Sequence, residues 1–259
     1  MRMNNNLSRA ANLFAVLTIL ITPGWLIRAI AQENSNPSSN PTFKVTFKPP
    51  TVDQPKTSKG AASRCIGQCN NENQAENSSL PLVPLIPAST KGLTVSSHPT
   101  VLVYFSSNSA SLVLFSWRNE DSSDHYQTIL PLNNQSGVIS LTLPDDAPPL
   151  EVGKNYQWAL AIIPNGKLKP DTPTIEGQIQ RVALEATTRD RLQTANSLET
   201  VVIYGEAGIW YETVATLAKL RKAAPDDHNL ASNWQNLLAS VGLEKIAQIP
   251  SDSSDFHLK

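Results

Sequence analysis

Cys65 and Cys69 are the residues whose type and spacing most directly predict a covalent bond in this chain. They lie in the sequence Cys-Ile-Gly-Gln-Cys, with three residues between them, whereas a redox-active pair is separated by two. Two neighbouring thiols in an oxidising compartment pair most simply with each other, so we expect a Cys65–Cys69 disulfide that closes a short loop. A metal site would need further ligands, and no histidine is near in sequence.

The remaining polar residues give little support for catalysis. Nucleophilic catalysis needs a Ser, Cys or Thr oriented by a base, and the Gly-x-Ser-x-Gly motif is absent from the sequence. Asp226-Asp227-His228 predicts a helix cap, and His125 follows an Asp- and Ser-rich stretch typical of an exposed turn. A metal or calcium loop at either histidine is the alternative. We expect no catalytic, metal-binding or cofactor-binding residue.

Composition excludes several classes of protein. The 259 residues have a formal net charge of -1 and lack the excess of Lys and Arg that nucleic-acid binding requires. Hydrophobic residues make up 40% of the chain, which is enough for a core, and charged residues make up 17%. A typical soluble domain has about 25% charged residues. A polytopic membrane protein and a disulfide-dense small scaffold are both excluded.

The first 31 residues have the pattern of a secretory signal peptide. Arg2 and Arg9 precede the apolar run Leu13–Ile27, and Ala29-Ile30-Ala31 supplies a small-x-small cleavage site. The apolar run is shorter than the roughly 20 residues of a membrane span, so we expect no stable span once the signal is cleaved. We predict an exported protein of the periplasm or extracellular space, with anchoring by an uncleaved signal as the alternative.

Residues 32–90 are rich in Pro, Asn and Ser, and their only aromatic residues are Phe43 and Phe47. So little apolar surface cannot offset the entropy of ordering, and we expect a mostly disordered arm. Within the arm, Phe43–Lys48 alternates apolar with polar residues at a period of two. This alternation predicts an extended strand, laid either on an edge of the following domain or on the sheet edge of a partner.

Residues 91–186 have the short alternating strands and frequent turns of an antiparallel β-sandwich. Strands are expected at Gly92–Ser96, Thr100–Phe105, Ala110–Arg118, His125–Leu130, Ser136–Leu143, Lys154–Ile163 and Thr174–Glu185. Trp117 stands where the core tryptophan of an immunoglobulin-like third strand would be, and Leu150-x-x-Gly153-x-x-Tyr156 has the spacing of a tyrosine corner. We expect an immunoglobulin-like sandwich with these aromatic residues in its core.

Residues 187–250 change to a helical period of 3.6, and residues 251–259 are expected to form a disordered tail. One helix is predicted from Gly208 to Pro225 and a second over Leu230–Gly242, after a shorter one around 189–204. The spacing of Gly208, Trp210 and Pro225 is similar to that of one tetratricopeptide repeat. The expected fold class is α+β: an immunoglobulin-like sandwich followed by a helical hairpin that is partly tetratricopeptide-like.

The helices raise the question of a binding surface. If they present an open peptide-binding groove, the candidate partner-contact residues are Trp210, Tyr211 and Arg221. The alternative is that the helices pack on each other or on the sandwich, because a single repeat cannot bury its own apolar face.

Several stretches together carry a resemblance to a known family. They are Phe47-Lys-Pro-Pro50, Gly60-Ala-Ala-Ser-Arg64, Leu85-Ile-Pro87, Leu141-Thr-Leu-Pro144, Leu150–Trp158, Glu176–Val182 and Gly208-Ile-Trp210-Tyr211. Their order over residues 47–250 resembles that of a family of exported, mainly cyanobacterial proteins, domain of unknown function nine-two-eight. This chain has Glu212-Thr213 where that family usually has Asp-Ala. The resemblance implies location and architecture and carries over no site residue.

The sequence favours an exported, non-catalytic module that binds a protein or envelope partner of unknown identity, without nucleic acid and without a cofactor. A structural accessory protein of the envelope, without a discrete ligand, is one alternative. A carbohydrate-active hydrolase is the least favoured alternative, and its acids would be Glu206 and Glu212 beside Trp210.

Overall fold

The computed structural model of the chain describes residues 43–50, 82–87, 91–106, 112–121, 123, 125–132, 136–163, 167–169, 172, 174–249 and 254–257. Grouped by their contacts, Pro41–Lys259 form one unit, and every element below belongs to it. The predicted signal peptide and the cysteines Cys65 and Cys69 lie outside the described residues.

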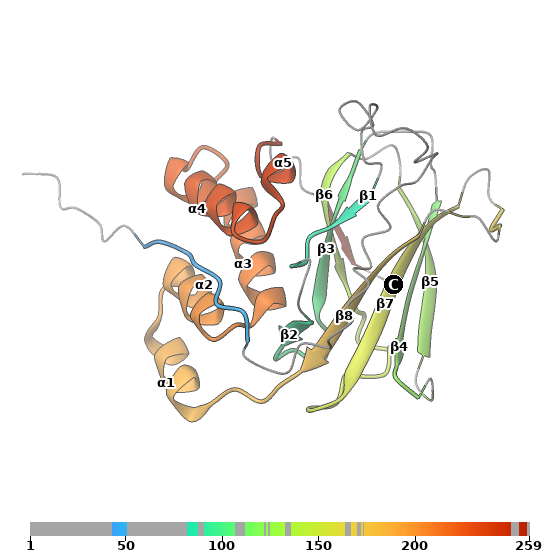
Figure 1. The fold of residues 1–259 in the computed structure, drawn as a ribbon, viewed down its shortest axis with the longest axis horizontal. Helices are drawn as coiled ribbons and strands as arrows, with labels where there is room; N and C mark the ends of the chain where they lie inside the picture. The colour runs from blue at the N-terminus through green and yellow to red at the C-terminus, as the bar shows by residue number, and fades with distance from the viewer. Residues whose placement is uncertain are drawn as a thin grey trace, which may run out of the picture. The chain divides into compact units, whose positions relative to one another are not determined.

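The strands of the described residues form two sheets (Figure 1). They are β1 (Leu82–Pro84), β2 (Gly92–Thr94), β3 (Thr100–Phe105), β4 (Leu112–Asn119), β5 (His125–Pro131), β6 (Gly137–Thr142), β7 (Asn155–Ile163), β8 (Thr174–Arg181) and β9 (Ser254–His257). One sheet has the order β1-β3-β6-β9 and the other the order β2-β8-β7-β4-β5. Two pairs, β2 with β8 and β6 with β9, are parallel. The sheets are therefore mixed: the two parallel pairs lie at sheet edges, and the other strand pairs are antiparallel, as predicted.

Alternation along the central strands places their large side chains in the core. Along β4, Val113, Phe115 and Trp117 are buried in turn, because successive side chains of a strand point to opposite faces. Trp117 is paired in register with Trp158 of β7, which in turn faces Gly177 of β8. A Cβ atom at Gly177 would overlap the indole of Trp158, so the missing side chain makes room for that ring.

The tyrosine corner predicted from the spacing of Leu150, Gly153 and Tyr156 is present. The Tyr156 hydroxyl accepts a hydrogen bond from the Glu151 N–H at 2.9 Å. Gly153 has a φ of +86°, a conformation that suits glycine at this turn. Tyr156 also packs edge-on against Trp117, with ring centroids 5.1 Å apart, so both aromatic residues belong to the core as expected.

Helices occupy the chain after β8. They are α1 (Ala186–Thr194), α2 (Ser197–Glu206), α3 (Trp210–Ala223), α4 (His228–Ala239) and α5 (Glu244–Ala247). Where one short helix was expected there are two, because Asn196 begins α2 with a capping box that it forms with Glu199. Asp227 caps α4 by accepting hydrogen bonds from the N–H groups of Asn229 and Leu230, as predicted.

One hydrophobic core extends from the sandwich into the helices. It includes Phe115 and Trp158 from the sheets, Trp210 and Trp234 from the helices, and Val45 from the arm. α3 contacts β2 and β3 and is thereby the element that joins the two parts. Among the residues described, no helix has the length and apolar character needed to cross a bilayer.

Candidate functional site

The segment Phe43–Pro50 crosses the helices as an extended chain and joins neither sheet (Figure 1). Val45 is only 1% exposed, whereas Lys44, Thr46 and Lys48 are exposed, so the segment has one buried and one solvent face. The alternation thus predicted an extended conformation correctly, but the expected edge strand on the sandwich was wrong. The buried face of this segment packs against the helices instead. We call Phe43–Pro50 the arm segment.

Asn233 of α4 holds the backbone of the arm segment. Its Oδ1 accepts a hydrogen bond from the Val45 N–H at 2.7 Å, and its Nδ2 donates to the Phe43 carbonyl oxygen at 3.0 Å. Nδ2 also donates to the Asn229 side chain at 3.0 Å, which fixes the orientation of the amide. Asn233 is 3% exposed, so these hydrogen bonds form away from solvent. The amide of Asn233 therefore satisfies one N–H group, that of Val45, and one carbonyl group, that of Phe43, of the extended segment.

Two glycines allow the arm segment to approach the helices closely. The Lys48 N–H donates to the Gly205 carbonyl oxygen at 3.0 Å. A Cβ atom at Gly205 would overlap the Thr46 carbonyl oxygen, and one at Gly208 would lie 2.8 Å from the Lys48 carbonyl oxygen. Gly208 also has a φ of +72°, a backbone conformation that residues other than glycine rarely adopt. Beyond Val45, the backbone of the arm segment thus stays in contact with the backbone of the helices, at Gly205 and Gly208.

Trp210 supplies the aromatic surface of the site. The ring of Phe47 packs edge-on against it, with centroids 4.8 Å apart and an interplanar angle of 75°. The indole Nε1 of Trp210 donates to the Leu85 carbonyl oxygen at 2.8 Å, which fixes the ring against the sandwich. We call Gly205, Gly208, Trp210 and Asn233 together the arm seat.

The next residue, Tyr211, fastens α3 to the five-stranded sheet. Its hydroxyl accepts a hydrogen bond from Trp158 Nε1 at 2.9 Å and donates to the Gln178 carbonyl oxygen at 3.1 Å. A Cβ atom at Gly92 would overlap the Tyr211 ring, so glycine is needed where the ring enters. Burial raises the pKa of the Tyr211 hydroxyl, which stays protonated and able to donate.

Glu212 fastens the same turn of α3 to the chain that follows β2. Its Oε1 accepts hydrogen bonds from the Thr94 hydroxyl at 2.6 Å and from the N–H groups of Val95 at 3.0 Å and Ser96 at 3.1 Å. Its Oε2 is buried and, within the described part of the chain, has no hydrogen-bond partner. Burial raises the pKa of the carboxyl group, and the hydrogen bond from Thr94 lowers it in part.

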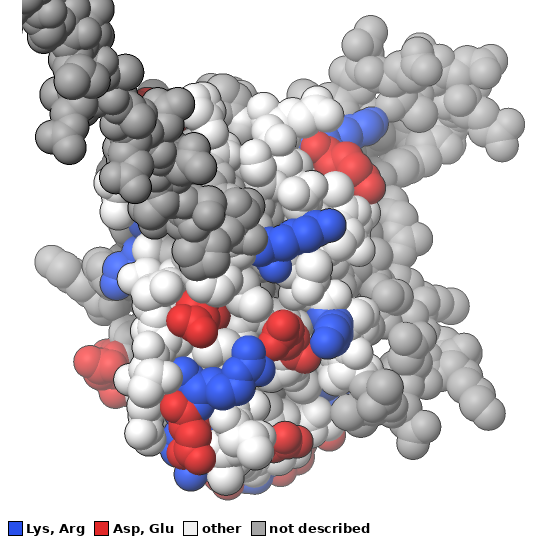
Figure 2. All heavy atoms as spheres, turned by 90° about the vertical axis from the view of Figure 1, so that its left-hand side faces the viewer, with Lys and Arg blue, Asp and Glu red and all other residues white. Residues whose placement is uncertain are grey.

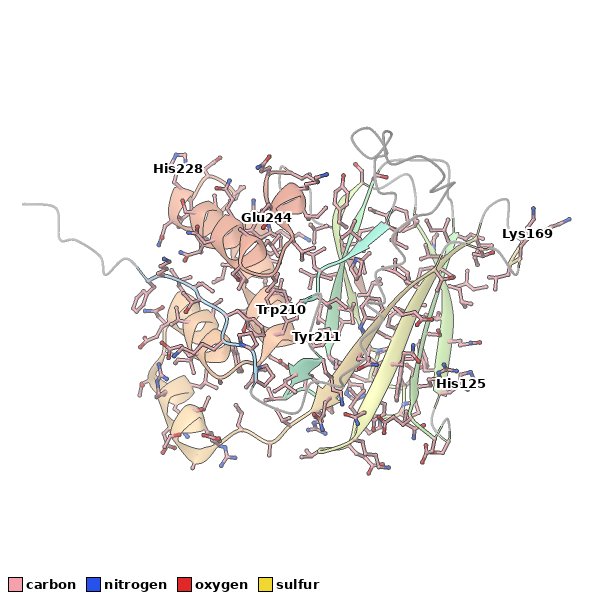
Figure 3. All side chains as sticks on the ribbon, in the orientation of Figure 1. His125, Lys169, Trp210, Tyr211, His228 and Glu244 are labelled. Atoms are coloured by element: carbon pink, nitrogen blue, oxygen red, sulfur yellow. The ribbon has the colours of Figure 1, made fainter. Side chains whose placement is uncertain are left out.

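Of the three residues expected to contact a partner, Trp210 and Tyr211 lie inside this chain. Trp210 is 0% exposed and Tyr211 is 2% exposed, and Figure 3 shows both between the helices and the sheets. While the arm segment is in place, neither side chain has surface to offer an outside molecule, so their assignment as open contact residues is corrected. Arg221 is half-buried, with its guanidinium 4.9 Å from the centre of the Trp234 ring. Its contact with a partner stays a prediction.

The residues considered for chemistry lie apart from the arm seat. Glu206 forms an ion pair with Arg191 at 2.9 Å, while Glu212 faces the sandwich. His125 lies on β5, on the side of the molecule away from the helices (Figure 3). Beside it, a polar hollow on the outer sheet face is lined by Ser116, Arg118, His125, Gln127, Gln157 and Glu176, among others. In the described ranges, no group of His, Cys, Asp and Glu side chains has the arrangement of a metal site.

The loop before His125 is explained by local hydrogen bonds. Asp121 Oδ1 accepts from the Ser123 N–H at 3.2 Å and from its hydroxyl at 2.9 Å. These hydrogen bonds lower the pKa of the Asp121 carboxyl group. The Asp121 carboxylate thus accepts its hydrogen bonds from within the loop, as is typical of the exposed turn that the sequence predicted.

The face that carries the helices has mixed charge. Figure 2 shows Lys and Arg side chains interspersed with Asp and Glu over the described part of this face, where neither sign forms a large area.

Asn233 is the site residue that the sequence reasoning missed. A signal was present, since Asn233 lies between Leu230 and Leu237 on the apolar face of α4. A polar residue on such a face is buried only if it has hydrogen-bond partners, so the position itself indicates a partner group.

The comparisons with known proteins give one family and weak structural likenesses, two of which are described here. The family described as Domain of Unknown Function (DUF928) matches residues 59–251, a range that begins after the arm segment. No curated protein matches the chain. A solved fn3 domain of human collagen alpha-1(XX) chain is 17% identical with a TM-score of 0.26, covering 42% of this chain and 86% of its own.

The second solved structure is a family 76 glycoside hydrolase from a bovine Bacteroides thetaiotaomicron strain, 14% identical with a TM-score of 0.27. The match covers 61% of this chain and 38% of the hydrolase. TM-scores of this size support no argument about fold or activity, so the site has to be interpreted from its own geometry.

Proposed function

The chain belongs to the family described as Domain of Unknown Function (DUF928), and we propose that it is an exported, non-catalytic interaction module whose arm seat binds extended peptide segments. The arm segment is then the chain's own copy of such a ligand. Export rests on the signal-peptide pattern of residues 1–31, and the Cys65–Cys69 disulfide is proposed with it, because that compartment is oxidising.

The observation that carries the proposal is the pairing of Asn233 with two backbone groups of the arm segment, at 2.7 and 3.0 Å. An amide that pairs with a peptide N–H and C=O recognises an extended backbone whatever its side chains are. Selectivity then comes from two positions, the buried place of Val45 and the contact of Phe47 with Trp210. The ligand class is an extended segment with a β-branched residue followed two positions later by an aromatic residue.

The finer architecture is part of the proposal. We propose that the two sheets form an immunoglobulin-like sandwich and that the helices form a tetratricopeptide-like hairpin. The Tyr156–Glu151 hydrogen bond and the buried Trp117 support the first. The contact of α3 with α4, and an extended chain lying on both, support the second.

The test uses the whole chain with its own segment displaced. The variant Val45→Asp puts a charge at a buried position and should empty the arm seat. A fluorescent peptide with the sequence of residues 43–50 should then bind saturably, with affinity lost at least tenfold when Asn233→Ala is added. A peptide with Asp at the valine position is the matched control.

If Val45→Asp fails to fold by near-ultraviolet circular dichroism, Val45→Thr is the milder variant for the same titration. Absence of peptide binding to a folded variant with a displaced segment contradicts the proposal. Binding that is indifferent to Asn233→Ala contradicts it as well, because the seat would then not be the binding surface.

A further inference from the structure

The arm segment and the arm seat are distant in the chain, although they are in contact. Val45 and Asn233 are separated by 188 residues, and the hydrogen bonds of the segment go to Asn233 and Gly205 in the helices. Nothing in these contacts requires that segment and seat belong to the same molecule. Resting on the proposed function, we propose that two copies of this chain exchange arm segments, so that each copy's residues 43–50 occupy the other's seat.

The connection to the rest of the chain is much longer than docking in one molecule needs. Pro50 Cδ lies 3.4 Å from the position of a Cβ atom at Gly208, and Leu85 accepts the hydrogen bond of Trp210. Pro50 therefore lies beside Gly208, just before α3, and Leu85, three residues beyond the end of the connection at Leu82, lies against Trp210, the first residue of α3. Residues 51–81 number 31, which at full extension span about 100 Å, several times the diameter of a small domain. The connection has the length to reach the seat of a neighbouring copy.

Exchange conserves every contact of the arm segment. The two Asn233 hydrogen bonds, the Lys48–Gly205 hydrogen bond and the Phe47–Trp210 contact are the same whichever copy supplies the segment. A second copy of this chain is thus a partner that fits the arm seat residue by residue. Swapping an identical element between protomers is a low-cost route to a closed dimer with two-fold symmetry.

Concentration decides between the two arrangements. A short flexible connection gives an effective concentration in the millimolar range, and this falls roughly as the −3/2 power of length as the connection grows. For a connection of 31 residues the effective concentration within one molecule is therefore no more than millimolar, so exchange competes when the protein itself is about as concentrated. Once one segment has crossed, the second exchange takes place within the complex and is favoured in the same way.

Charge does not oppose the pairing of two copies. The formal net charge of the chain is -1, and Figure 2 shows both signs interspersed over the face that carries the helices. Two identical faces of this kind can approach each other without a large repulsion between like charges.

The experiment compares the mass of the complex in solution for the wild-type chain and two single variants. The wild-type chain is unfolded and refolded at about 1 mM, so that segments and seats meet at a concentration near the intramolecular one. Sedimentation should then give a doubled mass, whereas Val45→Asp and Asn233→Ala, treated identically, should stay monomeric. A mixture of these two variants should form a 1:1 complex, because the first supplies an intact seat and the second an intact segment.

The outcomes separate this inference from the proposed function. A wild-type chain that stays monomeric after refolding at about 1 mM overturns exchange, and peptide binding to the Val45→Asp seat would leave the proposed function standing. Loss of peptide binding overturns both. A wild-type dimer that survives in Val45→Asp also overturns exchange, because another surface would then join the copies. Should Val45→Asp not fold, Val45→Thr takes its place and should lower the dimer fraction at least several-fold.

Discussion

The indole Nε1 of Trp158 donates a hydrogen bond to the hydroxyl of Tyr211 at 2.9 Å, and this bond joins the central strand β7 to the helix α3. The same hydroxyl donates a hydrogen bond to the Gln178 carbonyl oxygen of β8 at 3.1 Å. Because Trp210, the preceding residue, forms the aromatic surface of the arm seat, the geometry of the seat depends on how α3 is fastened to the sheet.

Removing the Tyr211 hydroxyl should destabilise the fold. Tyr211→Phe leaves the buried Trp158 Nε1 without an acceptor and removes the hydrogen bond to the Gln178 carbonyl oxygen, at a cost of about 1–3 kcal/mol in the free energy of unfolding. Chemical denaturation measures this cost. Tyr204→Phe on α2 is the matched control, expected to change stability by less than about 0.5 kcal/mol. Equal effects of the two variants would contradict the importance of the Trp158–Tyr211 bond.

Asn233→Leu should release the arm segment. Leucine fills the volume but leaves the Val45 N–H and the Phe43 carbonyl oxygen without partners. Because unpaired backbone groups are costly to bury, the arm segment should leave the helices and form these hydrogen bonds with water. Hydrogen–deuterium exchange of residues 43–48 should quicken at least tenfold. Asn236→Leu, on the exposed side of α4, should leave that exchange unchanged. Unchanged exchange in Asn233→Leu would mean that the amide is not what holds the segment.

Gly205→Ala should destabilise the protein, although alanine favours a helix over glycine by roughly 1 kcal/mol. The added Cβ would overlap the Thr46 carbonyl oxygen, so the arm segment must move away from α2. In a Val45→Asp background the segment is already displaced, and the same substitution should become neutral or stabilising. This change of sign, followed by chemical denaturation, is the result that tests the close approach. Stabilisation in both backgrounds contradicts it.

Glu212 should make stability depend on pH. Burial raises its pKa in the folded state above the unfolded value, so its contribution to stability is fully present below the unfolded pKa, about 4.3 for Glu. That contribution is lost as pH rises through the higher, folded pKa. Glu212→Gln keeps an oxygen to accept the three hydrogen bonds and carries no charge.

The wild-type chain should therefore lose stability relative to Glu212→Gln between about pH 4 and neutral pH. Unfolding midpoints of both proteins across this range measure the difference. If the wild-type chain instead gains on the variant as pH rises, the hydrogen bonds from Thr94, Val95 and Ser96 outweigh burial and the expected direction is wrong.

Arg221 tests whether the exposed side of the helices takes part in partner binding. Arg221→Gln removes the cation over the Trp234 ring, which should cost about 0.5–1 kcal/mol in the free energy of unfolding. If Arg221 also contacts a partner, binding of that partner should fall by more than stability explains, whereas Lys222→Gln, the neighbouring cation, serves as control. An equal loss of binding in both variants would remove Arg221 from the contact residues.

Local sequence patterns predicted the elements that depend on local chemistry. The strands β3 to β8, the Asp227 cap and the tyrosine corner at Tyr156 follow from alternation, capping residues and spacing over a few positions. The parallel pairing of β2 with β8 and of β9 with β6 could not be found in this way, because the register between distant strands is not encoded in the local pattern of either segment. Both lie at sheet edges, where pairing is set by tertiary contact.

The site was harder to predict, for the same reason. Alternation at Phe43–Lys48 gave the conformation but not the surface that it covers, since the partner Asn233 lies 188 residues from Val45. Trp210 and Tyr211 were candidate contact residues for a partner in the case that the helices left a peptide-binding groove open. Burial reversed that interpretation, and Glu212, considered as an acid for hydrolysis, instead accepts backbone N–H groups.

The burial of Val45 in the common core has a consequence for limited proteolysis. A single cut between Pro50 and Leu82 would leave two fragments whose covalent link is gone but whose hydrogen bonds and apolar contact remain. Such a nicked protein would elute as one particle from a sizing column and separate into two bands only on a denaturing gel, as two-piece complementing proteins do.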